Sequence, residues 1–339
     1  MVRLPCAGYT PDPALRASRS STPFAYADVV APAAVDWKAA GGVTAVKDQG
    51  QCGSCWAFST TGSLEGANFV TNGALVSLSE QELIDCDKAG NDRGCNGGLM
   101  DYAYDWIIHN GGLDTEADYP YTAADNVCDA TKKATAAVSV TSFQDVPPND
   151  EASLKKAVSQ QPVAIAIAAS GLQFQLYSHG VFDGQCSNNL DHGVLIVGYG
   201  TDEETGKDFW LVKNSWGEAW GESGYVRMAM NHSRTGLCGL AMVPSYPLVA
   251  KAGPPAPPGP TPGPTPSPTP VPPPPSDVTC DASTSCPSGS TCCCRAYTRR
   301  DASPADPLPR RRMSTRRRRH RRRRCYERVE RVGQPSALI

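Results

Sequence analysis

The chain has 339 residues, 14 cysteines and a formal net charge of −2. Residues 1–250 carry 15 basic and 28 acidic side chains, whereas residues 251–339 carry 17 and 6, which indicates two regions that do not share one surface. The sequence has no run of about 20 apolar residues, which excludes a membrane-spanning helix. The many cysteines favour an oxidising compartment and structural disulfides.

The first 30 residues are rich in Ala, Ser, Pro and Arg and show no usable periodicity, so they are expected to be a lead-in. They lack the apolar core of about 7–15 residues that a signal peptide has. This conflicts with the cysteine content, and the natural start of the protein is therefore expected to lie elsewhere.

Residues 31–249 carry ordered patterns, with helices first. Apolar residues from Cys55 to Val70 predict a helix that begins after Ser54. The segment 79–82 is a capping box for a second helix, and residues 100–108 have helical spacing that ends at the glycines 111–112. Strands are predicted at 163–168, 194–199, 209–213 and 225–230. Helices followed by strands indicate an α+β fold of two subdomains with a cleft between them.

The cysteine count of this region singles out one thiol. Seven cysteines lie between residues 31 and 249, so three disulfides would leave one over. Cys55 is the candidate, because the N-terminus of a helix favours a thiolate. An inert buried thiol is the alternative. The side-chain amide of Gln49 and the N–H of Cys55 could stabilise a developing oxyanion.

A nucleophilic thiol requires a base, and one of the five histidines stands out. His192 stands at the start of a predicted strand, 137 residues after Cys55. Asn214 ends the next strand, where its amide oxygen could hold the imidazole, and Trp216 could cover that bond from water. A histidine in this position, taken alone, is more often structural.

With these residues in this order, the sequence resembles the papain-like cysteine peptidases, the plant and cathepsin L-type family, over residues 31–249. The resemblance rests on the signature at 52–56 and on motifs at 81–86, 94–98, 198–200 and 238–240. It implies a helical half and a β-barrel-like half with the active-site cleft between them.

The resemblance also implies the roles of individual residues. Cys55 would be the nucleophile, His192 the base and then the acid, Asn214 the orienting residue and Gln49 the oxyanion donor. The implied disulfides are Cys52–Cys95, Cys86–Cys128 and Cys186–Cys238.

The residues implied to bind substrate are all uncharged, which predicts a preference for Leu, Val or Phe at substrate position P2 and discrimination against Arg. They are Gly97, Gly98, Leu99, Met100, Ala166, Leu190, Gly193, Trp216 and Val243.

The resemblance therefore predicts a cysteine endopeptidase that hydrolyses peptide bonds through an acyl-thioester, without metal or cofactor. Its partners would be protein and peptide substrates and cystatin-type inhibitors, not nucleic acid or membrane, and the protein would be a monomer. A lysosome, a vacuole or secretion is implied, with a role in intracellular or vacuolar protein degradation.

Both ends depart from the family pattern. Residues 24–30 resemble the end of an inhibitory propeptide, so residues 1–30 would be its remnant, the mature start would lie near Ala31, and the chain would fold poorly when expressed alone. Residues 250–276 are proline-rich and predict an extended, disordered linker, with a site for proline-recognition modules as the alternative.

Residues 277–294 resemble the opening of a granulin module, as in a plant and green-algal subgroup, and there the resemblance stops. Residues 295–339 are arginine-rich and predicted to be disordered. An altered reading frame is favoured over a divergent tail. A nucleic-acid role is disfavoured, because no aromatic residue interleaves the arginines.

Three other functions compete. The C-x-x-C spacing of Cys52 and Cys55 permits a dithiol oxidoreductase, but no βαβ unit precedes it. Zinc binding would need a second pair at similar spacing. A non-catalytic role is disfavoured because the catalytic set is intact.

Overall fold

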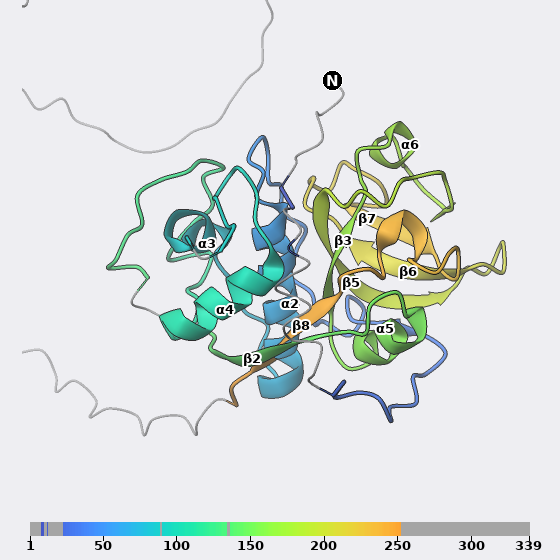
Figure 1. The fold of residues 1–339 in the computed structure, drawn as a ribbon, viewed down its shortest axis with the longest axis horizontal. Coiled ribbons are helices and arrows are strands. Elements are labelled where there is room, and N and C mark those ends of the chain that lie inside the picture. Colours follow the sequence, from blue (N-terminus) through green and yellow to red (C-terminus); the bar gives the residue numbers. More distant parts are fainter. Residues whose placement is uncertain (1–7, 10–11, 13–22, 89, 134–135, 252–339) are drawn as a thin grey trace, which may run out of the picture. The chain divides into compact units, whose positions relative to one another are not determined.

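The computed structural model describes residues 8–9, 12, 23–88, 90–133 and 136–251 (Figure 1). The predicted linker from residue 252 on, the granulin-like segment and the arginine-rich tail lie outside the described residues. No helix in the described ranges combines the length and the apolar character needed to cross a membrane.

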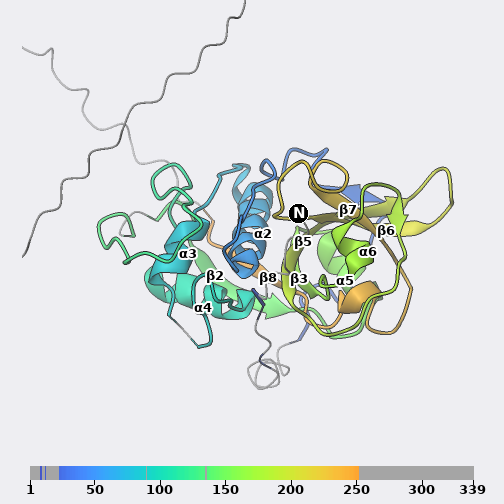
Figure 2. The ribbon, with the colours of Figure 1, turned by 90° about the horizontal axis from the view of Figure 1, so that it is seen from above.

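Three helices form one side of the structure: α2 (Cys55–Asn72), α3 (Glu80–Cys86) and α4 (Met100–Asn110). Helix α2 lies between the other two helices and the sheet, and it packs against α3 and α4 as well as β5 and β8 (Figures 1 and 2). Every residue of α2 from Cys55 to Asn68 is buried. A helix enclosed in this way gives its first residue a fixed position at the junction of the two halves.

The predicted capping box at α3 forms only in part. Ser79 caps the helix, and its Oγ accepts a hydrogen bond from the N–H of Glu82 at 2.9 Å. The Glu82 carboxylate does not return to Ser79 but accepts from the N–H of Asp114 at 2.7 Å and from Asn110 at 3.2 Å. The Ser79 N–H donates instead to the Asp114 carbonyl. The loop after α4 thus completes the cap of α3 and joins the two helices.

The other side is a mixed but mainly antiparallel sheet. Its strands are β1 (Val35–Asp36), β2 (Val140–Asp145), β3 (Val163–Ile167), β4 (Val181–Phe182), β5 (His192–Thr201), β6 (Asp208–Lys213), β7 (Tyr225–Ala229) and β8 (Ser245–Val249). Their order is β2-β8-β3-β5-β6-β7-β4, with β1 pairing with β5. Between them come α5 (Glu151–Val158), α6 (Leu172–Gln175) and the 3₁₀ turn η1 (Leu237–Gly239).

The α+β architecture is confirmed, but the expectation of a barrel-like half needs a correction. The two ends of the sheet, β2 and β4, do not pair with each other in the described residues, so the sheet is open. Each half has its own apolar core, and β3 takes part in both. Ile165 and Ile167 face the core of the sheet half, whereas Ala164 and Ala166 face the core of the helical half. The period-two alternation of a strand explains this division.

A buried ion cluster fixes the loop that leads to α2. The ammonium of Lys47 lies 2.8 Å from Glu80 of α3, 3.6 Å from Glu65 of α2 and 3.4 Å from Glu116. Burial raises the pKa of Glu80 to about 7, against the opposing charge of Lys47. Because a buried carboxylate needs a partner, this lysine holds the 47–54 loop against both helices.

Candidate active site

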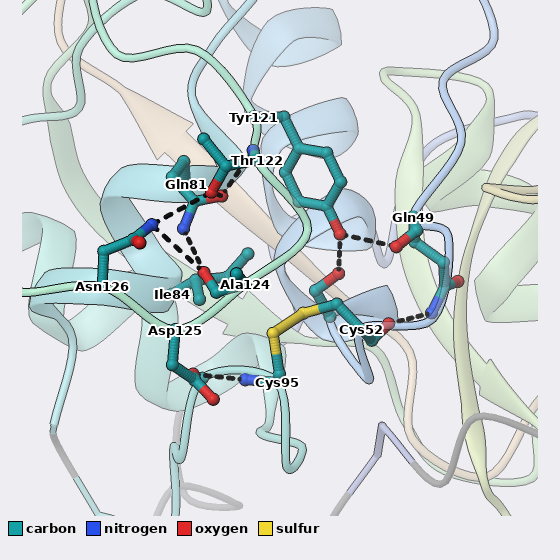
Figure 3. Close-up of a disulfide and its surroundings, with 12 residues drawn as sticks. Gln49, Cys52, Gln81, Ile84, Cys95, Tyr121, Thr122, Ala124, Asp125 and Asn126 are labelled. Carbon is teal, nitrogen blue, oxygen red and sulfur yellow. Dashed lines mark hydrogen bonds between the residues drawn. A yellow bond between two sulfur atoms is a disulfide. The ribbon is translucent and has the colours of Figure 1, made fainter. Parts of the chain in front are cut away.

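Cys55 is the first residue of α2, and the side chain that could cap this helix is used elsewhere. Ser54 occupies the N-cap position but makes no side-chain bond to the first turn. Its Oγ lies 2.7 Å from the hydroxyl of Tyr121. The Tyr121 hydroxyl donates to the carbonyl of Gln49 at 2.7 Å (Figure 3). The positive end of the helix dipole is therefore directed at Cys55 and favours a thiolate there.

The loop carrying Tyr121 is itself held by α3. The Gln81 side chain accepts from the N–H of Thr122 at 2.8 Å and donates to the carbonyl of Ala124 at 2.7 Å (Figure 3). These bonds fix Tyr121, and through it the loop that leads to Cys55. This support was not predicted from the sequence, because it joins residues about 40 positions apart.

Three disulfides use six of the seven cysteines in the described residues. They are Cys52–Cys95, Cys86–Cys128 and Cys186–Cys238, the pairs that the resemblance implied. Figure 3 shows Cys52 bonded to Cys95, so it cannot form a redox pair with Cys55. Within the described ranges, no group of His, Cys, Asp and Glu is arranged to hold a metal ion.

His192 begins β5, and Asn214 follows β6, the next strand in the sheet. The Nε2 atom of His192 lies 2.8 Å from Oδ1 of Asn214. Because an amide oxygen only accepts, Nε2 must carry the proton, which leaves Nδ1 as the basic nitrogen of the neutral ring. The indole of Trp216 stacks on the imidazole, with ring centroids 4.8 Å apart, and covers the bond.

The first residues of β5 contact the thiol at the N-terminus of α2. The N–H of Gly193 donates to Sγ of Cys55 at 3.3 Å, which brings the adjacent His192 to the same helix end. Burial lowers the pKa of His192 to about 4, while the bond to Asn214 and the charge of Asp191 act in the opposite direction. The imidazole is thus neutral in this structure unless a thiolate forms beside it.

Gln49 is buried and held at both ends of its amide. Its Nε2 donates to the carbonyl of Cys52 at 2.9 Å, and its Oε1 accepts from Ser215 at 2.7 Å. An amide nitrogen carries two protons, and the bond to Cys52 uses one. The second proton can serve an oxyanion beside Cys55.

The residues predicted to form the specificity pocket come together at the junction of the halves. Leu99, Met100 and Ala166 belong to one buried apolar cluster, and Leu190 and Val243 pack against it. Gly193 pairs with Ala166 across β3 and β5. Gly97 and Gly98 precede α4, whereas Trp216 lies apart, over His192.

Residues 8 and 9, which the sequence did not mark, lie on this site. The carbonyl of Gly8 accepts from the N–H of Gly98 at 3.0 Å, and Tyr9 forms a parallel bridge with Gly98. Tyr9 is buried in the same cluster as Leu99 and Met100. A Cβ on Gly8 would lie 2.5 Å from Sγ of Cys55, so the backbone of this segment covers the thiol.

Comparison with known proteins gives concordant matches. The family described as papain family cysteine protease matches residues 31–248. The probable cysteine protease RD21B of Arabidopsis thaliana is 58% identical over 268 residues, which are 78% of this chain and 54% of that protein. The oryzain beta chain of Oryza sativa subsp. japonica is 58% identical over 264 residues, 78% of this chain and 56% of that protein. The chain thus spans about half the length of these curated relatives.

Solved structures give the same answer for the fold. The ragweed pollen cysteine protease Amb a 11 in its proform is 46% identical with a TM-score of 0.66, covering 70% of this chain and 74% of that one. The bromelain protease from Ananas comosus, in complex with the inhibitor E64, is 42% identical with a TM-score of 0.61, covering 65% of this chain and 100% of that one.

Proposed function

Because the chain belongs to the papain family of cysteine proteases, we propose that it is an endopeptidase that acts through Cys55, His192 and Asn214. One observation carries the proposal. Cys55, alone among the seven described cysteines in lying outside a disulfide, is the first residue of α2, and its Sγ accepts from the N–H of Gly193. His192, which precedes Gly193 in the chain, is bonded to Asn214 at 2.8 Å. Nucleophile, base and orienting residue are the three parts that covalent acyl transfer requires.

The first half of the reaction forms the acyl-enzyme. The proton of the Cys55 thiol passes to His192, and the thiolate attacks the carbonyl carbon of the scissile peptide bond. The negative charge that develops on the carbonyl oxygen is stabilised by the second amide proton of Gln49 and by the N–H of Cys55. When the C–N bond breaks, the imidazolium donates its proton to the leaving amine, and a thioester remains.

The second half releases the acid. Neutral His192 takes a proton from water, the hydroxide attacks the thioester carbon, and the proton returns to the departing sulfur. Asn214 keeps the ring in the orientation that serves both halves, since its oxygen also accepts from the N–H of Ser215 at 2.8 Å and is itself fixed. Trp216 excludes water that would compete for that bond.

The chemistry of the specificity pocket supports a hydrophobic P2 residue. In the structure, the cluster that contains Leu99, Met100 and Ala166 also encloses the aromatic ring of Tyr9. An uncharged pocket offers no partner to a guanidinium, and burying an unpaired charge is costly. We expect peptide substrates with Leu, Val or Phe at P2 to have a kcat/KM about tenfold or more above that of a P2-Arg substrate. A P2-Arg substrate that is cleaved faster would contradict the pocket assignment.

Membership of the same family supports a proposal for the compartment and the partners. Three disulfides are stable in an oxidising lumen, so we propose a vacuole, a lysosome or secretion, with degradation of proteins and peptides as the role. Cystatin-type inhibitors are the expected protein partners, and the expected state is a monomer. As in Amb a 11, whose structure is a proform, a zymogen stage is expected.

Active-site labelling tests the proposal directly. An epoxide-type thiol inhibitor is expected to modify Cys55 alone, and peptide mapping by mass spectrometry locates the adduct. The matched control is Cys55→Ser, which keeps the shape of the side chain and is expected to lose both labelling and peptide hydrolysis. Full hydrolytic activity in Cys55→Ser, or an adduct on another residue, would overturn the assignment.

A further inference from the structure

Residues 23–29 come before the first strand of the sheet, and they lie on the sheet half at a distance from the catalytic residues. Shortly after them, the carbonyl of Pro32 accepts from the hydroxyl of Tyr199 at 3.0 Å. Tyr199 lies seven residues along β5 from His192, which is on the order of 20 Å at the spacing of a strand. The contacts of segment 23–29 are therefore not part of the reaction described above.

A buried glutamine of β2 binds the backbone of this segment with both ends of its amide. Gln144 is 9% exposed, its Nε2 donates to the carbonyl of Pro23 at 2.5 Å, and its Oε1 accepts from the N–H of Ala25 at 3.0 Å. The hydroxyl of Tyr246, the residue opposite Gln144 on β8, donates to the same oxygen. Because an unsatisfied buried amide is costly, an empty site would need water or another backbone carbonyl in place of Pro23.

Two aromatic side chains of the segment add apolar contact. The ring of Tyr26 stacks on that of Tyr246, with centroids 5.1 Å apart and an interplanar angle of 25°. Phe24 meets Tyr26 edge-on at 5.9 Å, and both rings pack against the apolar core of the sheet half. The hydroxyl of Tyr26 donates to Oε1 of Gln161 at 3.4 Å. The segment thus buries aromatic surface where it also satisfies polar groups.

A lysine of α5 binds the other end of the segment. The Nζ atom of Lys156 donates to the carbonyl of Ala27 at 2.6 Å. The N–H of Ala27 donates to the carbonyl of Phe24 at 3.2 Å, so the backbone turns between the glutamine and the lysine. Beyond this turn, Val30 is 93% exposed. The chain is therefore fixed on both sides of an exposed residue, by this site before it and at Pro32 after it.

We propose that a second peptide-binding site, separate from the catalytic groove, lies on the sheet half, and that its ligand is segment 23–29 of this chain. Gln144, Lys156 and Tyr246 form the site. The glutamine and the lysine bind backbone groups, and the tyrosine ring selects an aromatic side chain. The site keeps the segment bound when the chain is cut at Val30, because none of these contacts depends on the peptide bonds there. The inference does not rest on the proposed reaction.

Binding of a synthetic peptide tests the site in the full chain. The probe is a fluorescently labelled peptide of residues 22–30, and the chain carries Cys55→Ser so that the probe is not hydrolysed. Phe24→Ala together with Tyr26→Ala weakens the chain's own segment and frees the site. Fluorescence anisotropy is expected to show that this variant binds the probe at least about tenfold more tightly than the chain that keeps both rings, because a tethered segment competes at a high effective concentration.

Two neighbouring lysines of α5 give a matched pair of variants in this background. Lys156→Ala removes the bond to the carbonyl of Ala27 and is expected to weaken the binding of the probe about threefold to tenfold. The ammonium of Lys155 lies over the ring of Tyr199 at 4.8 Å instead, so Lys155→Ala is expected to leave the affinity within about twofold. Gln144→Ala removes both backbone bonds and is expected to weaken binding by about tenfold or more, with thermal unfolding as the check that this variant is folded.

Equal binding of the probe by the chains with and without the two rings would overturn the inference, as would the absence of saturable binding to the variant that lacks them. Binding that survives both Gln144→Ala and Lys156→Ala would place the peptide elsewhere, for example in the catalytic groove, and would contradict the site. Dimerisation of the freed chain without uptake of the probe would assign this surface to a second copy and not to segment 23–29. None of these results bears on the labelling of Cys55, so the site and the proposed function are tested independently.

Discussion

Alanine in place of His192 is expected to lower kcat by about 10²–10⁴-fold, the usual contribution of a positioned general acid and base. In the proposed reaction the imidazole accepts the thiol proton and later protonates the leaving amine. Among the described side chains, His192 is the histidine whose ring nitrogen is bonded to Asn214. KM should change little, because Gly98 and the apolar pocket, and not His192, are proposed to hold the peptide. Steady-state kinetics with one hydrophobic-P2 substrate measure both constants.

The matched control is His179→Ala. His179 is an exposed histidine that contacts Ser178 and lies outside the site, so its removal is expected to leave kcat within about twofold. The kcat of Asn214→Ala is expected to lie between those of His192→Ala and His179→Ala, because the imidazole remains but loses the bond that orients it. A His192→Ala enzyme with unchanged kcat would show that another residue is the base.

The local parts of this site could be predicted from sequence because short patterns determine them. A run of apolar residues after Ser54 is sufficient to start a helix at Cys55, and a buried strand that begins at His192 needs only the apolar stretch after it. The odd number of cysteines predicted that one thiol would be left over, and the predicted start of a helix made Cys55 the candidate. The strands β2 and β8, by contrast, depend on their pairing with each other, and Pro247 inside β8 argues against a strand when the sequence alone is considered.

The contacts that join separate loops and segments at the site could not be predicted, because they follow no pattern in the sequence. Asp92 accepts a hydrogen bond from the N–H of Leu99, and Gln81 accepts one from the N–H of Thr122, and both contacts exist only in the folded chain. Gly8 and Tyr9 form one bridge and no periodic element, and an extended segment that binds by its backbone leaves no signature in side-chain spacing. Residues 1–30 were predicted to be a propeptide remnant on the basis of residues 24–30, and the segment that covers the thiol lies in the same range, nearer the N-terminus.

Gly8→Ala is expected to increase the rate at which an epoxide inhibitor labels Cys55 by about tenfold. The added methyl group would lie 2.5 Å from Sγ of Cys55 and 2.7 Å from the carbonyl oxygen of Gly53, distances that force the segment to move. In the unmodified chain the segment covers the thiol, and its own carbonyl is directed at the N–H of Gly98, not at Gln49. It therefore blocks the thiol without being presented for cleavage.

The matched control is Gly171→Ala, where a Cβ approaches no neighbour closer than 3.9 Å and labelling should stay at the unmodified rate. A lower pH is expected to expose the Cys55 thiol, as Gly8→Ala does. Burial lowers the pKa of His192 to about 4, so a neutral imidazole favours the covered state, and protonation below the ordinary value favours exposure. The labelling ratio of Gly8→Ala to the unmodified chain should then narrow as the pH falls. A ratio near one at every pH would show that residues 8–9 do not control access to Cys55.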